Sequence, residues 1–123
     1  MNRLEKDNIQ TVIQFNEALN ARDVTGMMRL MTQDCVFENT TPPPDGERFV
    51  GQEAVRRFWE QFFQDASEIH FEVEDLFGVE DRCVMRWVYT WKNRLGETGH
   101  IRGIDLYTLA GHRISGKYSY VKG

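Results

Sequence analysis

The sequence has few of the residues on which several classes of protein depend. It contains only two cysteines and three histidines in 123 residues, so we expect neither a disulfide-stapled scaffold nor a Cys/His zinc site. No apolar run approaches the roughly 20 residues that a membrane-spanning helix needs, and the start, residues 1–6, is polar. No basic cluster is present, and the net charge is −4. Nucleic acid and anionic membrane are therefore excluded as expected partners.

The positions of the few cysteines and histidines also predict the redox state of the thiols and the absence of a metal site. Cys35 and Cys83 lie far apart within apolar, strand-like patterns, which indicates buried, reduced thiols in a cytoplasmic protein. His70, His100 and His112 lack ligand spacing with one another or with the cysteines. We therefore predict no metal and no cofactor.

The composition is that of one globular domain. Hydrophobic residues make up 41% of the chain and charged residues 28%, both ordinary values for a soluble protein. Aromatic residues reach 12%, and 123 residues are enough to bury a core without staples. No internal repeat or low-complexity tract divides the chain. We predict a single domain over residues 1–123.

Apolar periodicity predicts three helices in the first half of the chain. Residues 7–21 carry an apolar stripe at helical spacing, and a short helix follows Asp23, a plausible N-cap. Residues 51–65 give the clearest pattern, with a wide aromatic face. A face of that width needs a large apolar surface to cover it, which a curved sheet supplies. Its members are Ala54, Val55, Phe58, Trp59, Phe62 and Phe63.

Strand patterns dominate the second half. A short strand at residues 35–39 precedes a loop with three consecutive prolines, which cannot join a sheet ladder. Alternation of apolar and polar residues then predicts four antiparallel strands in a meander. The order favours an α+β fold with the helices on one face of the sheet. The four strands fall at residues 69–74, 83–92, 100–109 and 113–120.

One residue of the last predicted hairpin is charged although its neighbours on the same face are largely apolar. Asp105 alternates with Ile101, Gly103, Tyr107 and Leu109, so a regular strand puts this carboxylate on a largely apolar face. Either it is a core aspartate satisfied by tyrosine and backbone donors, or it is a functional group facing a cavity. Arg86 and Arg102 should lie on the opposite face and should not reach it.

Four segments carry a family resemblance over nearly the whole chain. The chain resembles the SnoaL-like and ketosteroid-isomerase-like branch of the nuclear-transport-factor-2-like superfamily. The resemblance implies a cone-shaped α+β fold: three N-terminal helices packed on a curved, mostly antiparallel sheet. The resemblance says little about function, because proteins with this fold carry out many different reactions. The matching segments are residues 15–23, 34–39, 51–59 and 102–107, the last leading to Arg113-Ile114.

At the positions that match the catalytic residues of known family members, this chain has only some of the required residues. Ketosteroid isomerases use a carboxylate where this chain has Asn39 and a tyrosine where it has Phe15, whereas Asp105 matches their protonated aspartate. In relatives that resemble limonene-epoxide hydrolases, an acid stands on the last strand, near Ser119 here. Whether the protein is an enzyme therefore stays open at the level of the sequence.

The predicted function is a small-molecule pocket. We expect a largely apolar or aromatic ligand with a carbonyl or hydroxyl group, and possible proton-transfer chemistry of the isomerase, cyclase or hydratase type without a cofactor. Asp105 is the candidate catalytic group, either protonated by desolvation or kept ionised by a nearby guanidinium, with Tyr107 or the Asn39 amide as a second hydrogen-bond donor. The alternative is a non-catalytic binding protein, or a dimeric interaction module whose cone its own side chains fill. The predicted ligand-binding residues are Phe15, Phe37, Asn39, Phe58, Trp59, Phe62, Trp87, Tyr89, Asp105 and Ser119.

The last strand contains a conflict between two signals. Alternation places Ile114, Tyr118 and Tyr120 on one face, whereas the resemblance turns Lys117 and Ser119 toward the cavity, with Val121. We follow the resemblance, which sends both tyrosines outward. Outward tyrosines suit an interface, so we expect a homodimer through the outer face of the sheet.

Overall fold

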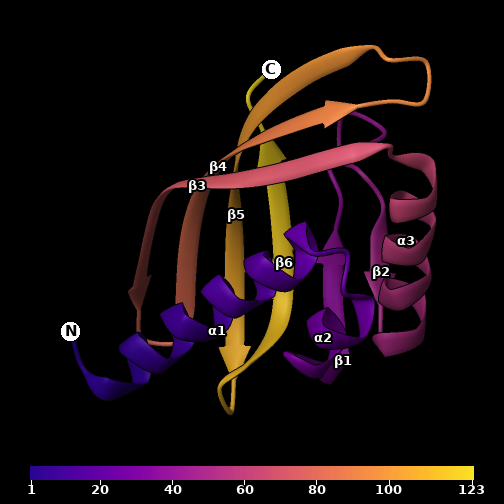
Figure 1. The fold of residues 1–123 in the computed structure, drawn as a ribbon. Helices are drawn as coiled ribbons and strands as arrows, with labels where there is room; N and C mark the ends of the chain where they lie inside the picture. The colour runs from indigo at the N-terminus through magenta and orange to yellow at the C-terminus, as the bar shows by residue number, and fades with distance from the viewer.

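The computed structural model describes residues 1–123, which form three helices and one six-stranded sheet (Figure 1). The first half of the chain holds the helices and the two short strands, and the second half is the strand meander. The helices are α1 (Arg3–Asn20), α2 (Val24–Arg29) and α3 (Gln52–Asp65). The strands are β1 (Met31–Glu38), β2 (Arg48–Val50), β3 (Glu68–Val79), β4 (Arg82–Lys92), β5 (Thr98–Ala110) and β6 (Arg113–Val121).

Local capping sets where each helix begins. The Asn2 side chain accepts from the Glu5 amide and the Glu5 side chain accepts from the Asn2 amide, so α1 starts one turn earlier than its apolar stripe suggests. Asp23 caps α2 as predicted, accepting from the Gly26 amide at 2.9 Å. Gly51, with φ of 89°, leads into α3. The three helices are confirmed, with an earlier start for α1.

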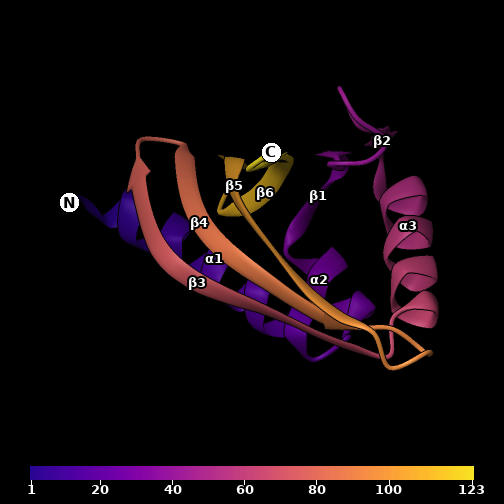
Figure 2. The same ribbon diagram turned by 90° about the horizontal axis from the view of Figure 1, so that it is seen from above.

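The sheet has the order β2-β1-β6-β5-β4-β3. All neighbours are antiparallel except β1 and β6, which run parallel. The β3–β6 meander is therefore confirmed, and β2 is an additional strand. In Figure 2 the long strands β3 and β4 follow an arc that ends near the C-terminal end of α3. The α+β architecture is thus a curved, mostly antiparallel sheet with helices against it.

One core joins all three helices to one face of the sheet. Val12 and Phe15 of α1, and Trp59 of α3, belong to the same buried cluster as Met85 and Tyr107 of the sheet. Cys35 and Cys83 are also in this cluster, and neither forms a disulfide, as predicted. Phe15 is fully buried and packs edge-on against the ring of Tyr107. The methionines of α2 are core filling, as expected for an adaptable side chain.

Polar side chains hold the helices against β3. Asn20 pairs with both backbone groups of Phe71: its Oδ1 accepts from the amide at 2.7 Å and its Nδ2 donates to the carbonyl at 2.9 Å. The Arg22 guanidinium donates to three carbonyls at the C-terminal end of α3 and just beyond it, those of Phe63, Ala66 and Ser67. These bonds fix the distance between α3 and β3, the two sides of the space described next.

A bulge in the last hairpin resolves the conflict on β6. Thr108 pairs with Gly116, but the next residue, Leu109, pairs with Ile114, so Ser115 is the extra residue on β6. The extra residue reverses the alternation, and both Ile114 and Lys117 therefore face the inside. Tyr120 then faces outward, as the resemblance implied. No helix of this chain is long and apolar enough to cross a lipid bilayer.

Candidate functional site

A cavity of about 320 Å³ lies between α3 and the inner face of the sheet. Its walls are mainly aromatic, and its polar groups come from β6, the end of α3 and the loop after β1. Phe71 and Tyr89 stack with their ring centroids 4.3 Å apart on one wall. Phe37, Phe58 and Trp59 pack together on another. The lining residues are Phe37, Asn39, Thr40, Thr41, Phe58, Trp59, Gln61, Phe62, Asp65, Phe71, Trp87, Tyr89, Ile101, Lys117, Ser119 and Val121.

The central polar feature of the cavity wall is a buried ion pair. Lys117 Nζ lies 3.0 Å from Asp105 Oδ2, and the two side chains are only 5% and 3% exposed. The register explains the contact, because Asp105 pairs with Ser119, which places Lys117 diagonally across from it on the same face. Asp105 Oδ2 accepts from the Tyr107 hydroxyl as well as facing this ammonium, so the side chain acts here as an acceptor.

Lys117 separates Asp105 from the cavity. Lys117 lines the cavity, whereas Asp105 does not. Tyr107 is fully buried and donates its hydroxyl hydrogen bond to Asp105 Oδ2 at 3.3 Å. Burial first, and then the neighbouring Asp105 charge, raise the pKa of Tyr107 well above its usual value, so it serves only as a donor. Asp105 and Tyr107 thus lie behind Lys117 and do not reach a ligand directly.

The hydrogen bonds of Lys117 leave one proton free. An ammonium group has three N–H donors and no acceptor. One faces Asp105 and a second donates to Ser119 Oγ at 3.0 Å. The Nζ atom also lies 4.8 Å from the ring centroid of Phe37 and 5.6 Å from that of Trp59, where the ring faces stabilise a cation. The third N–H has no acceptor among the polar groups of the protein.

Most of the predicted ligand-binding residues lie in this wall, and two do not. Phe15 belongs to the core beneath α1, because helix packing carries it behind Tyr107, and Asp105 lies behind Lys117. Tyr89 is half-buried, and burial raises its pKa to about 12, so its hydroxyl stays neutral near pH 7. The predicted residues that line the cavity are Phe37, Asn39, Phe58, Trp59, Phe62, Trp87, Tyr89 and Ser119.

Lys117 is the residue that sequence reasoning missed as a partner of Asp105. A lysine is almost never fully buried unless it is paired. The signal that could have found it was the resemblance, which turned this face of β6 inward and so put one basic residue on the same side as one acidic residue. The sequence pattern indicated only Arg86 and Arg102 as basic neighbours of Asp105, both on the opposite face.

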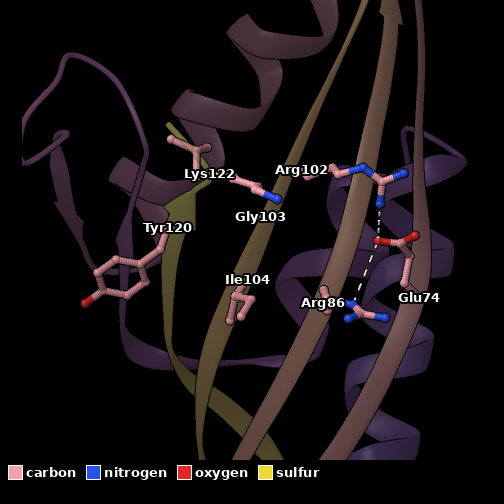
Figure 3. A pocket seen from close by; sticks show the side chains of 8 residues that line it. Glu74, Arg86, Arg102, Gly103, Ile104, Tyr120 and Lys122 are labelled. Carbon is pink, nitrogen blue, oxygen red and sulfur yellow. Dashed lines mark hydrogen bonds and ion pairs between the residues drawn. The ribbon is translucent and has the colours of Figure 1, made fainter.

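Those two arginines lie on the outer face of the sheet, as predicted. Arg102 contacts Glu74 at 2.6 Å and Arg86 contacts the same carboxylate at 3.9 Å. The two guanidinium groups hold the pKa of Glu74 below its usual value, chiefly through the Arg102 hydrogen bond. Figure 3 shows both arginines turned toward Glu74, with Ile104 and Tyr120 on the other side of this outer pocket. The outer pocket and the aromatic cavity lie on opposite faces of the sheet and share one lining residue, Val121 at the end of β6.

Metal ligands do not gather anywhere in the structure. No group of three or more His, Cys, Asp or Glu side chains could hold a metal ion. His70 and His100 both pair with Thr90 in the sheet. Both also line an open depression on the surface of these strands. His112 is at the β5–β6 turn. The histidines therefore take no part in the aromatic cavity.

The fold and its cavity define the class of protein. An NTF2-like protein of unknown function from Mesorhizobium loti superposes with a TM-score of 0.83 at 28% identity, covering 100% of this chain and 97% of that one. A provisional SnoaL-like polyketide cyclase from Jannaschia sp. CCS1 gives 0.86 at 15% identity, covering 99% and 90%. TerC, co-crystallised with polyporic acid, gives 0.82 at 13% identity, covering 94% and 92%. This is the NTF2-like fold.

The family follows from the sequence match. The SnoaL-like domain model matches residues 12–116, which include all three helices in whole or part and reach into β6. The chain belongs to the SnoaL-like domain family, as the resemblance implied. No curated protein sequence matches the chain.

Proposed function

We propose that this SnoaL-like protein binds a small aromatic molecule through a carbonyl oxygen that accepts a hydrogen bond from Lys117. The observation that carries the proposal is the free N–H of a buried ammonium at the wall of an aromatic cavity. A volume of about 320 Å³ falls within the range of roughly 300–1,000 Å³ typical of small-molecule sites. A volume of this size supports a ligand pocket over a fold whose interior its own side chains fill.

The charge of the site determines which kind of ligand oxygen suits Lys117, a carboxylate or a carbonyl. Asp105 already neutralises Lys117, so a ligand carboxylate would add an uncompensated charge in a largely apolar cavity. A neutral carbonyl accepts the free N–H and adds no net charge. The aromatic walls supply stacking and edge contacts for a ring beside that carbonyl.

Binding and polarisation of a carbonyl are better supported than proton abstraction. Lys117 could stabilise negative charge on a carbonyl oxygen, but a general base must also lie within hydrogen-bond reach of the proton that it removes. The only carboxylate lining the cavity is Asp65, at the exposed end of α3, where it accepts from Gln61. A base so open to water is poorly placed for isomerase or cyclase chemistry.

Tryptophan indole signals can test the cavity directly. We expect titration of ¹⁵N-labelled protein with N-methyl-2-naphthamide to shift the indole N–H resonances of Trp59 and Trp87, which line the cavity. Trp91 is a matched internal control, because it lies on the same strand as Trp87, β4, but outside the cavity. Two-dimensional NMR measures all three signals at once. An unchanged spectrum at the solubility limit, or a shift of Trp91 alone, would contradict the proposed function.

We also propose a homodimer through the outer face of the sheet. Ile104 and Tyr120 are neighbours on β5 and β6 and are 43% and 62% exposed, beside the ion cluster of Figure 3. We expect Ile104→Lys to convert a dimer to a monomer in sedimentation-equilibrium experiments, because it buries a charge at the interface. Leu95→Lys, at a turn residue that is 85% exposed, should leave the dimer intact. A wild-type protein that stays monomeric at high concentration rejects the dimer.

A further inference from the structure

We propose that the aromatic cavity continues into a second, polar subsite, and that the ligand is an aromatic carbonyl compound with a hydroxyl-rich substituent. This inference rests on the proposed function and adds the chemical class of the ligand's second part. The ring would occupy the aromatic cavity, the carbonyl would lie at Lys117, and the substituent would pass Ser119 toward the loop after β1.

The subsite is a groove of about 400 Å³ at the ends of β1 and β6. It adjoins the aromatic cavity, because four residues line both: Asn39, Thr40, Ser119 and Val121. The order along β6 gives the direction of the path. Lys117 lines only the inner cavity, Ser119 and Val121 line both spaces, and Tyr120 lines the groove. A ligand longer than one ring system can therefore extend from one space into the other.

The groove is rich in hydrogen-bond acceptors. It is lined by the carboxylates of Glu38 and Asp45, the amide of Asn39 and the hydroxyl of Thr40, and no lysine or arginine lines it. Arg48 already pairs with Glu38 at 3.0 Å, so the net negative charge of the groove is small. Uncharged hydroxyl donors suit this lining better than a cationic group, because several acceptors are present and only the Asp45 charge is uncompensated.

Ser119 lies where the aromatic cavity meets the groove, and the direction of its hydrogen bond with Lys117 is fixed. Lysine has no acceptor, so Ser119 Oγ must accept from Lys117 Nζ. The hydroxyl proton of Ser119 then points elsewhere, and no protein acceptor takes it. It is available to an oxygen of the ligand directly beyond the carbonyl. A polyol substituent supplies such an oxygen there and donors for the groove farther out.

The wall of the groove is held in place by backbone bonds. The Asn39 amide donates to the Glu47 carbonyl at 2.9 Å, and the Gly46 amide donates to the Pro42 carbonyl at 2.8 Å. Gly46 has φ of 73°, and a Cβ there would lie 1.8 Å from the Asn39 carbonyl oxygen, so this close approach requires glycine. A wall formed in advance lowers the ordering cost of binding.

A pair of probes that differ only beyond the carbonyl tests the subsite. N-methyl-2-naphthamide fills the aromatic cavity alone, whereas N-(2-naphthoyl)glucosamine adds a sugar directly after the same amide. We expect the sugar probe to bind about tenfold more tightly by calorimetry, the size expected for one or two net hydrogen bonds. We expect Asp45→Asn to remove about three- to tenfold of the sugar probe's affinity and to leave the methyl amide unchanged. Asp34→Asn, at an exposed strand residue outside the groove, should change neither affinity.

The two probes separate failure of the subsite from failure of the pocket. If the methyl amide binds but the sugar probe gains nothing and does not respond to Asp45→Asn, the subsite is rejected and the proposed function stands. If neither probe binds, both proposals are rejected. If the sugar probe's gain survives Asp45→Asn but disappears in Ser119→Ala, the junction holds the sugar and the groove does not, which also overturns the subsite.

Discussion

Asp105→Asn and Lys117→Met should each destabilise the protein by about 3–5 kcal/mol, the usual result of leaving one buried charge without its partner. The pair is almost fully buried, so bulk solvent does not reach the charge that loses its partner. In the double variant the loss should be smaller than the sum of the two by about 2 kcal/mol or more. The amide oxygen that Asp105→Asn introduces can still accept from Tyr107, whose hydroxyl donates to Asp105 in the wild-type protein. Urea denaturation of the four proteins in the cycle measures this coupling.

A surface pair provides the control cycle. Arg3 and Asp7 lie one turn apart on α1 with side chains 92% and 42% exposed. Arg3→Met and Asp7→Asn should couple by less than about 0.5 kcal/mol, as exposed helix pairs do. If the Asp105–Lys117 cycle is no more coupled than this one, the buried ion pair does not exist in solution.

The second large effect concerns ligand affinity. The double variant Asp105→Asn/Lys117→Met keeps the aromatic walls and loses the ammonium, so its affinity for N-methyl-2-naphthamide should fall about 10–100-fold, the loss of a hydrogen bond from a charged donor. Calorimetry or NMR titration measures this change. The double variant is preferred to Lys117→Met alone because it removes the unpaired carboxylate.

A hydrocarbon ligand is the matched control for that loss. 2-Ethylnaphthalene has a ring of the same size and no acceptor, so both proteins should bind it equally. An equal fall in affinity for both ligands would mean that the variant had collapsed the cavity. An unchanged affinity for the amide would mean that Lys117 does not contact the ligand.

The sequence was informative wherever local pattern decides structure. The alternation along β5 placed Asp105 inside correctly, because a strand has a period of two whatever its neighbours are. The aromatic stripe of residues 51–65 identified α3 and several residues of the cavity wall. Asp23 identified the start of α2, because capping involves only the first turn.

The sequence was less informative where long-range register decides. The bulge at Ser115 changes which face of β6 Lys117 occupies, and no pattern within β6 reveals it. β2 has only three residues and forms because β1 is beside it. Phe15 matched a family position that lines a cavity, yet in this chain it fills the core. The ion pair itself depends on two strands meeting in one register, which only the folded sheet specifies.

The place of β6 in the sheet affects how the protein is made. The last strand of the chain lies between β1 and β5 and supplies Lys117 and Ser119. While the chain emerges from the ribosome, β1 pairs with β2, but its other edge and the free edge of β5 have no partner until residues 113–121 appear. Pairings this distant in sequence form slowly and leave such edges open to aggregation. Residues 113–121 must therefore have emerged before the aromatic cavity is complete.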